Sequence, residues 1–184
     1  MTTAKLAAFF VSCAALFAGG CSGTEDSRQD GGPEAEIGAS LNSKSDVAIA
    51  DLPVGVLPAA RAVRPDITFT QAEREVRNGV IYFDVGGVDA NSQEIELDIM
   101  QDGDGWRVVE VQRDIDLSQT PAPVREALNA NAPGVTPDRI IESDQTDGVV
   151  IYEFFTRDPD GKETKYEVKF AAGEAEFLSE EWVH

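Results

Sequence analysis

Two stretches of the chain alternate charged and apolar residues without interruption. They are Glu94–Ile99 and Lys165–Phe170, and a period of two residues is typical of a β-strand with one face on a core and the other in water. Each is preceded by an apolar segment that contains Ile-Tyr and follows an Asn-Gly or Asp-Gly pair, which favours a tight hairpin turn. The two Ile-Tyr pairs, at Tyr82 and Tyr152, lie about 70 residues apart, which indicates an internal repeat.

Further turns follow the alternating strands and predict one more strand in each half. The turns are Asp102–Gly105 and Ala171–Glu174, and the strands after them are Trp106–Val111 and Ala175 to about Trp182. Counting the strand that enters each hairpin, every half should contain four antiparallel strands.

A short helix is predicted before the strands of each half. In the second half Thr120-Pro121 can cap a helix through Val124–Leu128, which should end at Pro133-Gly134. In the first half a helical spacing of apolar residues runs between Asp51 and Arg64, and Pro58 inside it should kink the helix or delay its start.

These elements predict an α+β fold of two tandem α-β4 repeats, residues 51–115 and 116–184. Each antiparallel sheet needs a cover for its apolar face, and one helix is available to each. The two sheets could also join edge to edge into one extended curved sheet.

The N-terminus predicts export and lipidation. Residues 1–20 have the weakly basic start and the apolar segment of a signal peptide, too short to span a membrane. Ala18-Gly19-Gly20-Cys21 resembles the bacterial lipobox, so Cys21 is expected to be acylated and to anchor the chain. The alternative is an ordinary secretory signal followed by a free cysteine. Residues 21–50 are rich in Gly, Ser, Asp and Glu without periodicity, which predicts a flexible acidic tether.

The composition of the chain limits which partners and which catalytic or metal sites are expected. With 34 acidic and 15 basic residues the net charge is −19, which disfavours nucleic acid and anionic lipid as partners. The one histidine is His184, so His-dependent nucleophilic catalysis and His/Cys zinc sites lack their residues. Asp102 and Asp158 lie in Asp/Gly turns without the spacing of a calcium loop. We therefore expect neither a metal, nor a cofactor, nor an enzyme.

The order of helix and strands, with Gly-Val-Ile-Tyr, Glu-Ile-Glu-Leu-Asp-Ile and Gly-Trp-Arg-Val-Val-Glu, resembles the PepSY-like domain and its tandem β-lactamase-inhibitor-like form. The resemblance covers about Asp51 to Val183 and implies a periplasmic protein with two α-β4 repeats. It also implies an open sheet face that binds another protein, a β-lactamase in the founding inhibitor. The chain lacks the cysteines of that inhibitor after Cys21. By resemblance to Gram-negative lipoproteins, Ser22 suggests the outer membrane facing the periplasm.

Three hypotheses of function follow. The first is a lipid-anchored module that binds, inhibits or senses a peptidase or other envelope protein through exposed aromatic residues of the sheet. The candidates are Trp106, Tyr82, Tyr152, Phe154 and Trp182, although strand aromatics are more often core. The second is a structural envelope lipoprotein without a specific partner, which predicts a uniformly polar sheet face. The third is a carboxylate-dependent hydrolase, which predicts two acids of perturbed pKa in one pocket.

Overall fold

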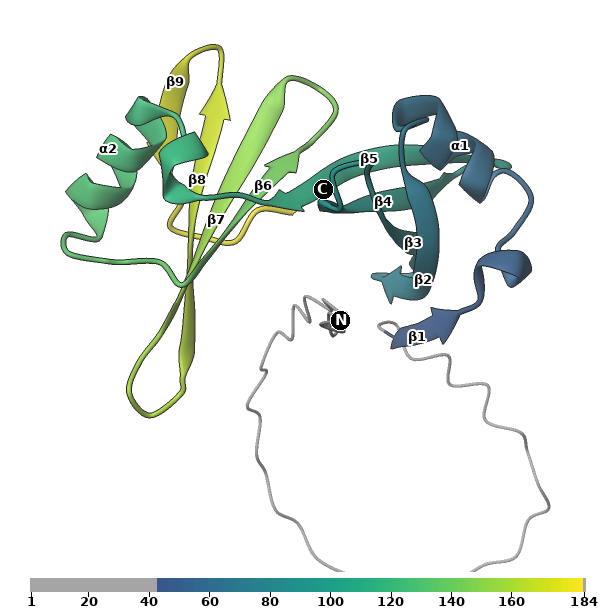
Figure 1. Cartoon of the computed structure of the whole chain (residues 1–184), viewed down its shortest axis with the longest axis horizontal. Helices are drawn as coiled ribbons and strands as arrows, with labels where there is room; N and C mark the ends of the chain where they lie inside the picture. The colour runs from purple at the N-terminus through teal and green to yellow at the C-terminus, as the bar shows by residue number, and fades with distance from the viewer. Residues whose placement is uncertain (1–42, 184) are drawn as a thin grey trace, which may run out of the picture. The chain divides into compact units, whose positions relative to one another are not determined.

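The computed structural model describes residues 43–183 (Figure 1). The predicted signal peptide, Cys21, the tether as far as residue 42, and His184 lie outside the described residues. Residues 43–50, also predicted as tether, are instead ordered: β1 spans Ser43–Val47 and a 3₁₀ turn, η1, spans Ile49–Asp51. This part of the prediction was wrong because β1 is held by pairing with a neighbouring strand, which requires no apolar run in its own sequence.

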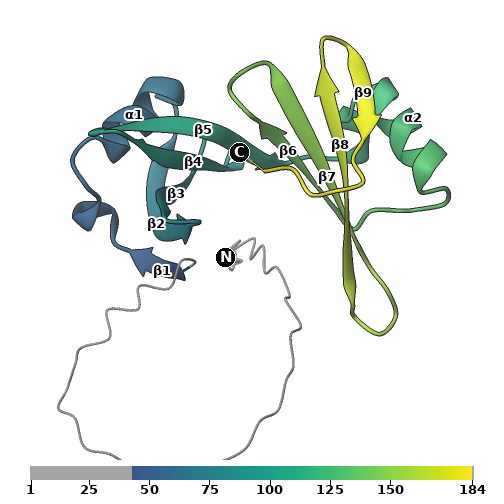
Figure 2. The same cartoon turned by 180° about the vertical axis from the view of Figure 1, so that it is seen from behind.

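The nine strands within residues 43–183 form one antiparallel sheet in the order of the sequence (Figures 1 and 2). After β1 the strands are β2 Thr68–Arg77, β3 Val80–Val88, β4 Glu94–Asp102, β5 Gly105–Asp114, β6 Arg139–Asp144, β7 Val149–Arg157, β8 Glu163–Ala171 and β9 Glu174–Phe177. The pairing of β5 with β6, from Val111–Asp144 to Asp114–Ile141, joins the strands of the two halves. The α+β class and the single joined sheet are confirmed.

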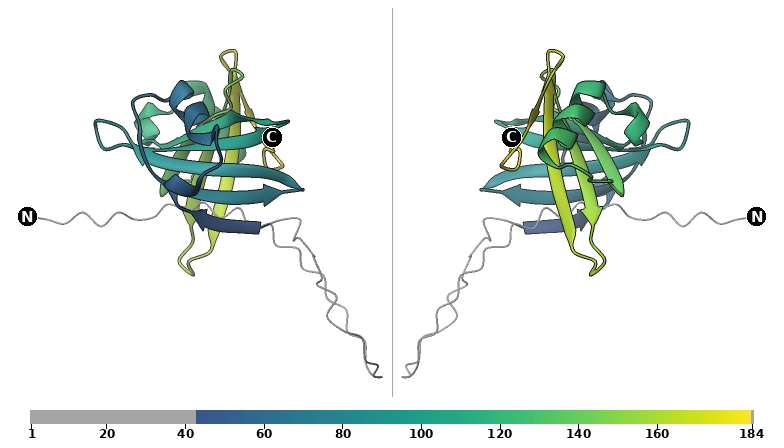
Figure 3. Two further views of the ribbon diagram at one scale, coloured as in Figure 1. Left: turned by 90° about the vertical axis from the view of Figure 1, so that its right-hand side faces the viewer. Right: turned by 90° about the vertical axis from the view of Figure 1, so that its left-hand side faces the viewer.

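Two helices pack on this sheet (Figure 3). Helix α1, Val56–Val63, contacts β4 and β5, and α2, Ala122–Asn131, contacts β8 and β9. Pro58 lies in the first turn of α1, where a backbone N–H has no partner within the helix, so the proline delays the start without breaking the helix. A second 3₁₀ turn, η2 at Leu117–Gln119, precedes α2. No helix among residues 43–183 is long and apolar enough to cross a membrane.

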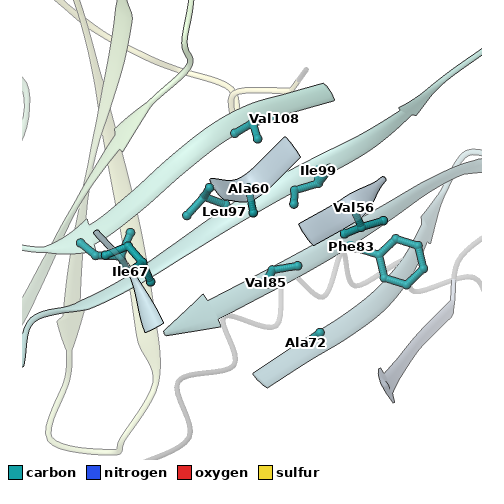
Figure 4. Packing of buried hydrophobic residues seen from close by; sticks show 10 residues of the cluster. Val56, Ala60, Ile67, Ala72, Phe83, Val85, Leu97, Ile99 and Val108 are labelled. Carbon is teal, nitrogen blue, oxygen red and sulfur yellow. The ribbon is translucent and has the colours of Figure 1, made fainter. Parts of the chain in front are cut away.

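Both helices cover the same face of the sheet. Val111 packs against the core under α1, and its strand neighbour Asp144 is paired in turn with Val150, which packs against the core under α2. Paired residues share a face. The core under α1 is made by Val56, Ala60, Ile67, Ala72, Phe83, Val85, Ile95, Leu97, Ile99 and Val108 (Figure 4). We call this side the helix face and the other side the open face.

The last strand is shorter than predicted. It ends at Phe177 rather than near Trp182, and residues 178–183 form a C-terminal tail. Leu178 makes the final backbone hydrogen bond, to the carbonyl of Glu167. Beyond it, Trp182 N–H donates to the carboxylate of Glu167 at 2.6 Å, so a side chain on the open face holds the tail instead of a strand partner.

Candidate functional site

A row of carboxylates crosses the open face of the first half. Strand pairing places Glu73 opposite Asp84, Asp84 opposite Asp98, and Asp98 opposite Glu110, on four adjacent strands. These four residues, here called the acid row, are 8, 5, 2 and 7 % exposed. Asp46 of β1 extends the row at its exposed end, opposite Glu73.

The alternation of the strands places the acid row on this face. Phe83 and Val85 point to the core under α1, so Asp84 between them points to the open face. Asp98 lies between Leu97 and Ile99 in the same way. The alternation of Glu94–Ile99 was therefore correct as a strand, but the prediction that its charged side chains lie in water was wrong: Asp98 is buried.

Two cations reach the acid row, one from the edge strand β1 and one from the end of β2. Lys44 of β1 lies with its Nζ 3.1 Å from Oδ2 of Asp84 and 3.3 Å from Oε2 of Glu73. Arg77, at the end of β2, donates to Oδ2 of Asp98 at 3.0 Å and stacks over the Tyr82 ring at 4.6 Å. Burial lowers the pKa of Lys44, but the Asp84 carboxylate and its neighbours outweigh this and leave that pKa raised.

Burial and mutual repulsion make the carboxylates weaker acids. Burial raises the pKa of Asp84 and of Glu73. It raises the pKa of Asp98 well above its usual range, helped by the charges of Asp84 and Glu110. Beside the row, burial followed by the charge of Asp84 raises the pKa of Glu96 to about 7. Glu96 is therefore partly protonated near neutral pH.

The second half carries a shorter version of the arrangement. Glu153 of β7 is paired with Glu167 of β8 on the open face, and Lys165 lies 3.3 Å from Glu153 and 2.7 Å from Glu167. Burial raises the pKa of Glu153 to about 7, although Lys165 opposes it. The C-terminal tail lies on this pair, and its Glu181 is also bonded to Lys165.

A chain of hydrogen bonds links the two acid groups through the tail. The Gln145 amide donates to Glu110 at 3.1 Å and accepts from the Trp182 indole at 2.9 Å. Trp182 in turn donates its backbone N–H to Glu167. The acid row of the first half and the acid pair of the second are therefore connected by protein groups.

The predicted aromatic patch is corrected by the structure. Phe154 and Tyr152 are 0 and 4 % exposed in the core under α2, because they alternate onto the helix face. Tyr82 is on the open face but buried beneath Arg77. Trp106 is half-buried and packs edge-on against Phe83 at 5.1 Å. Trp182 is half-buried in the tail, and Lys169 lies over its ring.

The two Ile-Tyr pairs are not equivalent in space. Tyr82 lies on the open face, since it is one residue from Phe83 of the core, whereas Tyr152 lies in the core under α2. If Phe83 is matched with Tyr152 instead, residues of the helix face in one half correspond to residues of the helix face in the other half. The same then holds for the open face. The sequence match was therefore wrong by one residue, and in a strand such a slip exchanges the two faces.

A cavity of about 480 Å³ lies on the helix face, beside the end of α1 and the β5–β6 junction. Its lining includes Arg64, Asp89, Arg113 and Glu142. Arg113 is bonded there to Glu142 at 2.7 Å, and Arg64 to Asp66 at 2.9 Å. None of the acids whose pKa is raised lines it, so cavity and acid row lie on opposite faces of the sheet.

The described residues offer no metal centre. No group of three or more His, Cys, Asp or Glu side chains within residues 43–183 is arranged to hold a metal ion. Asp158 accepts hydrogen bonds from the backbone N–H groups of Asp160 and Lys162, which is the behaviour of a turn residue.

Comparison with known proteins adds no relative. No protein-family model, no curated protein and no solved structure matches the chain.

Proposed function

We propose that the chain is a non-enzymatic protein-binding module of the cell envelope, anchored by a lipid on Cys21. In this proposal residues 51–115 and 116–184 are two tandem α-β4 repeats of the PepSY-like type, and the outer membrane, facing the periplasm, is the expected location. The open face of the first repeat binds a basic segment of an envelope protein, through its carboxylates rather than through aromatic residues.

The observation that carries the proposal is the acid row. Like charges directly opposite one another in a sheet are destabilising, and here three such contacts follow one another in a buried row. Proteins tolerate departures of this kind at functional sites, where stability is sacrificed for activity or binding. A cationic partner would relieve the repulsion that the fold leaves in place.

The repeat assignment is supported by a constant offset in residue number that relates the two halves on both faces of the sheet. Glu153 and Glu167 lie 69 residues after Asp84 and Asp98, and Phe154 lies 69 residues after Val85. The order of elements after η1 is also one helix and four strands, twice. One gene segment duplicated in the past would account for both.

Separation of the cavity from the weak acids supports binding rather than hydrolysis. A hydrolase that uses two carboxyl groups needs them to converge on one substrate in a pocket. Here the acids of raised pKa are on the open face, and the cavity on the helix face is lined by arginines already paired with acids.

A structural envelope lipoprotein is the second candidate, and one observation favours it. The large hydrophobic residues exposed in the described chain include no aromatic side chain: they are Val54, Val63, Val80, Leu117 and Val183. They do not supply the aromatic anchors that usually dominate protein-binding sites.

A crosslinked pull-down from envelope extract separates the two candidates. The bait is the full chain tagged in the exposed turn at 158–161, compared with a Glu73→Gln/Glu75→Gln variant. An Asp102→Asn/Asp104→Asn bait is the matched control, because it removes the same charge from an exposed turn. An envelope protein lost only with the first variant supports the binding module. Equal recovery by all three baits, or no enriched protein, would favour the structural lipoprotein.

The anchor is tested separately. Cells fed a labelled fatty acid should label the wild-type chain and not a Cys21→Ser variant. A labelled Cys21→Ser protein would place the lipid elsewhere.

A further inference from the structure

Strand β1 has little to hold it on the sheet apart from its backbone pairing and one lysine. Four of its five residues are exposed, and Val47 is the only one that packs against the core. Its backbone is paired with β2 from Ser43–Val76 to Val47–Ala72. The small apolar contact means that the hydrophobic effect contributes little to keeping β1 in place.

The side chain of Lys44 occupies a pocket of carboxylates. Its Nζ lies within 3.9 Å of Glu73, Glu75 and Asp84, here called the lysine socket, and the side chain is 28 % exposed. No other residue of β1 is basic. In the described part of the chain, β1 therefore presents the socket with one cation on an extended backbone.

The same two features would recognise a strand from another protein. An extended peptide can add to the edge of a sheet by backbone hydrogen bonds, while pockets for alternate side chains give specificity. Without β1, the edge of β2 from Ala72 to Val76 would present unpaired N–H and C=O groups. The three socket carboxylates would then lose Lys44 and keep Arg77, which lies 2.8 Å from Glu75 and 3.7 Å from Asp84.

We propose that the edge of β2 and the lysine socket form a strand-addition site for an extended peptide with a lysine or arginine, and that β1 occupies this site within the chain. This inference rests on the proposed function, since it specifies how a basic partner would bind. The partner strand would run antiparallel to β2, with its basic residue opposite Glu75 and a small apolar residue three positions later, as Lys44 and Val47 are placed.

A reversible lock on β1 tests the proposal. Ser45 is paired with Arg74, so a Ser45→Cys/Arg74→Cys variant can form a disulfide between the two strands. Both residues point to the helix face, away from the socket, because Arg74 is also paired with Phe83. The background is the full chain with Cys13→Ser and Cys21→Ser, which removes its two native cysteines.

The probe is a fluorescent peptide with the sequence Ser-Lys-Ser-Asp-Val-Ala-Ile, compared with the same peptide carrying norleucine in place of lysine. The lysine peptide should bind the reduced variant and lose binding when the disulfide forms, and reduction should restore it. Norleucine should weaken binding at least about tenfold, the equivalent of one charge-assisted hydrogen bond. A Lys44→Ala variant should bind the lysine peptide more tightly than wild type, since β1 then competes less well.

Three results would overturn the proposal: binding that the disulfide does not change, equal binding of the two peptides, or failure of the reduced variant to bind. The locked protein also serves as bait in the envelope pull-down. A partner retained by the locked bait but lost with Glu73→Gln/Glu75→Gln would refute strand addition and leave the binding module intact. If the peptide binds but no envelope partner is recovered, the strand-addition site would stand and the proposed function would be refuted.

Discussion

The open face carries a pair of opposed acids in each half of the chain, but a different segment of the chain covers each pair. In each half two acids are paired across adjacent strands: Asp84 of β3 with Asp98 of β4, and Glu153 of β7 with Glu167 of β8. In the first half the covering segment, β1, contributes a cation to the acids. In the second half the C-terminal tail contributes a further carboxylate and a tryptophan.

In the function proposed above, this difference distinguishes an acid pair that the tail already covers from an acid row that would accept a ligand. The tail is fixed by hydrogen bonds of Trp182 to Glu167 and Gln145, so its contacts are specific to that segment. β1 offers mainly backbone groups and a single lysine, which any extended basic peptide can reproduce. We therefore regard the second half as structural and the first as the binding half.

The cores on the helix face should be alike in the two halves, although the open faces differ. Truncating one buried side chain in each core tests this expectation. Phe154→Ala should lower the free energy of unfolding by about 3–5 kcal/mol, the usual cost for a fully buried phenylalanine. Val85→Ala, at the equivalent place under α1, should cost less, about 1–2 kcal/mol, because fewer atoms are removed. Urea unfolding measures both. The exposed Val54→Ala is the control, and a cost for Phe154→Ala as small as the control's would remove Phe154 from the core.

The next largest effect concerns a glycine that the first half has and the second lacks. A Cβ on Gly87 would lie 2.3 Å from the carbonyl oxygen of Thr68, where the pairing of β2 and β3 is irregular. Gly87→Ala should therefore destabilise the fold by about 2–3 kcal/mol through overpacking. Position 156, the counterpart by the 69-residue offset, is a threonine in a regular pairing.

A second glycine is the control for this variant. A Cβ on Gly105 has one neighbour within 4 Å, at 3.6 Å, so Gly105→Ala should change stability by less than about 0.5 kcal/mol. If Gly87→Ala were equally neutral in thermal unfolding, the close approach of β2 to β3 would not exist in solution.

Much of the fold could be predicted from the sequence because it depends on local pattern. The alternation of Glu94–Ile99 and the turns at Gly79 and Gly148 predicted strands that are present. The register between halves could not be predicted in this way. Tyr82 and Tyr152 have identical neighbours on one side, yet they lie on opposite faces, since a strand pattern shows which residues share a face but not which face is covered.

The acid row was missed for a related reason. Glu73, Asp84, Asp98 and Glu110 belong to four strands and become neighbours only through pairing. Each acid alone is typical of a solvated strand face, and in a chain with 34 acidic residues none of them is conspicuous. A signal was present in the pairs Glu73/Glu75 and Glu96/Asp98, which place two acids on one face of a strand. It predicts acidity of the face but not its burial.

A dependence of stability on pH should reveal the weak acids of both halves. Glu96 and Glu153 have a pKa of about 7 in the folded chain, against 4.5 for the unconstrained group. Between these values the folded chain binds more protons than the unfolded chain, so stability falls as pH rises from about 4.5 to 7. The loss should be about 2 kcal/mol between pH 5 and pH 8, below the full shift because the groups are not wholly buried. Acids whose pKa is lowered, such as Asp66, act in the opposite sense only below about pH 4.

Two variants assign this pH dependence to the halves. Glu96→Gln should remove the contribution of Glu96 in the first half and Glu153→Gln that of Glu153 in the second, and each should stabilise the protein at pH 8 more than at pH 5. Glu174→Gln, at an exposed position, should leave the profile unchanged. Stability that did not change between pH 5 and pH 8 would show that these carboxylates are solvated.

The smallest effect tests whether the tail is a structural cover. Trp182→Phe keeps an aromatic ring near Lys169 but removes the indole N–H that donates to Gln145 at 2.9 Å. The loss should be about 1 kcal/mol, since the buried amide oxygen of Gln145 is left without its donor. Lys44→Met in β1 provides the contrast: if β1 is the replaceable cover, hydrogen exchange of the β2 amides should rise with Lys44→Met, while Trp182→Phe should leave it unchanged. Faster exchange in β2 with Trp182→Phe would mean that the chain of hydrogen bonds through Gln145 and Glu110 couples the two covers, and the first half could not then be treated as an independent binding surface.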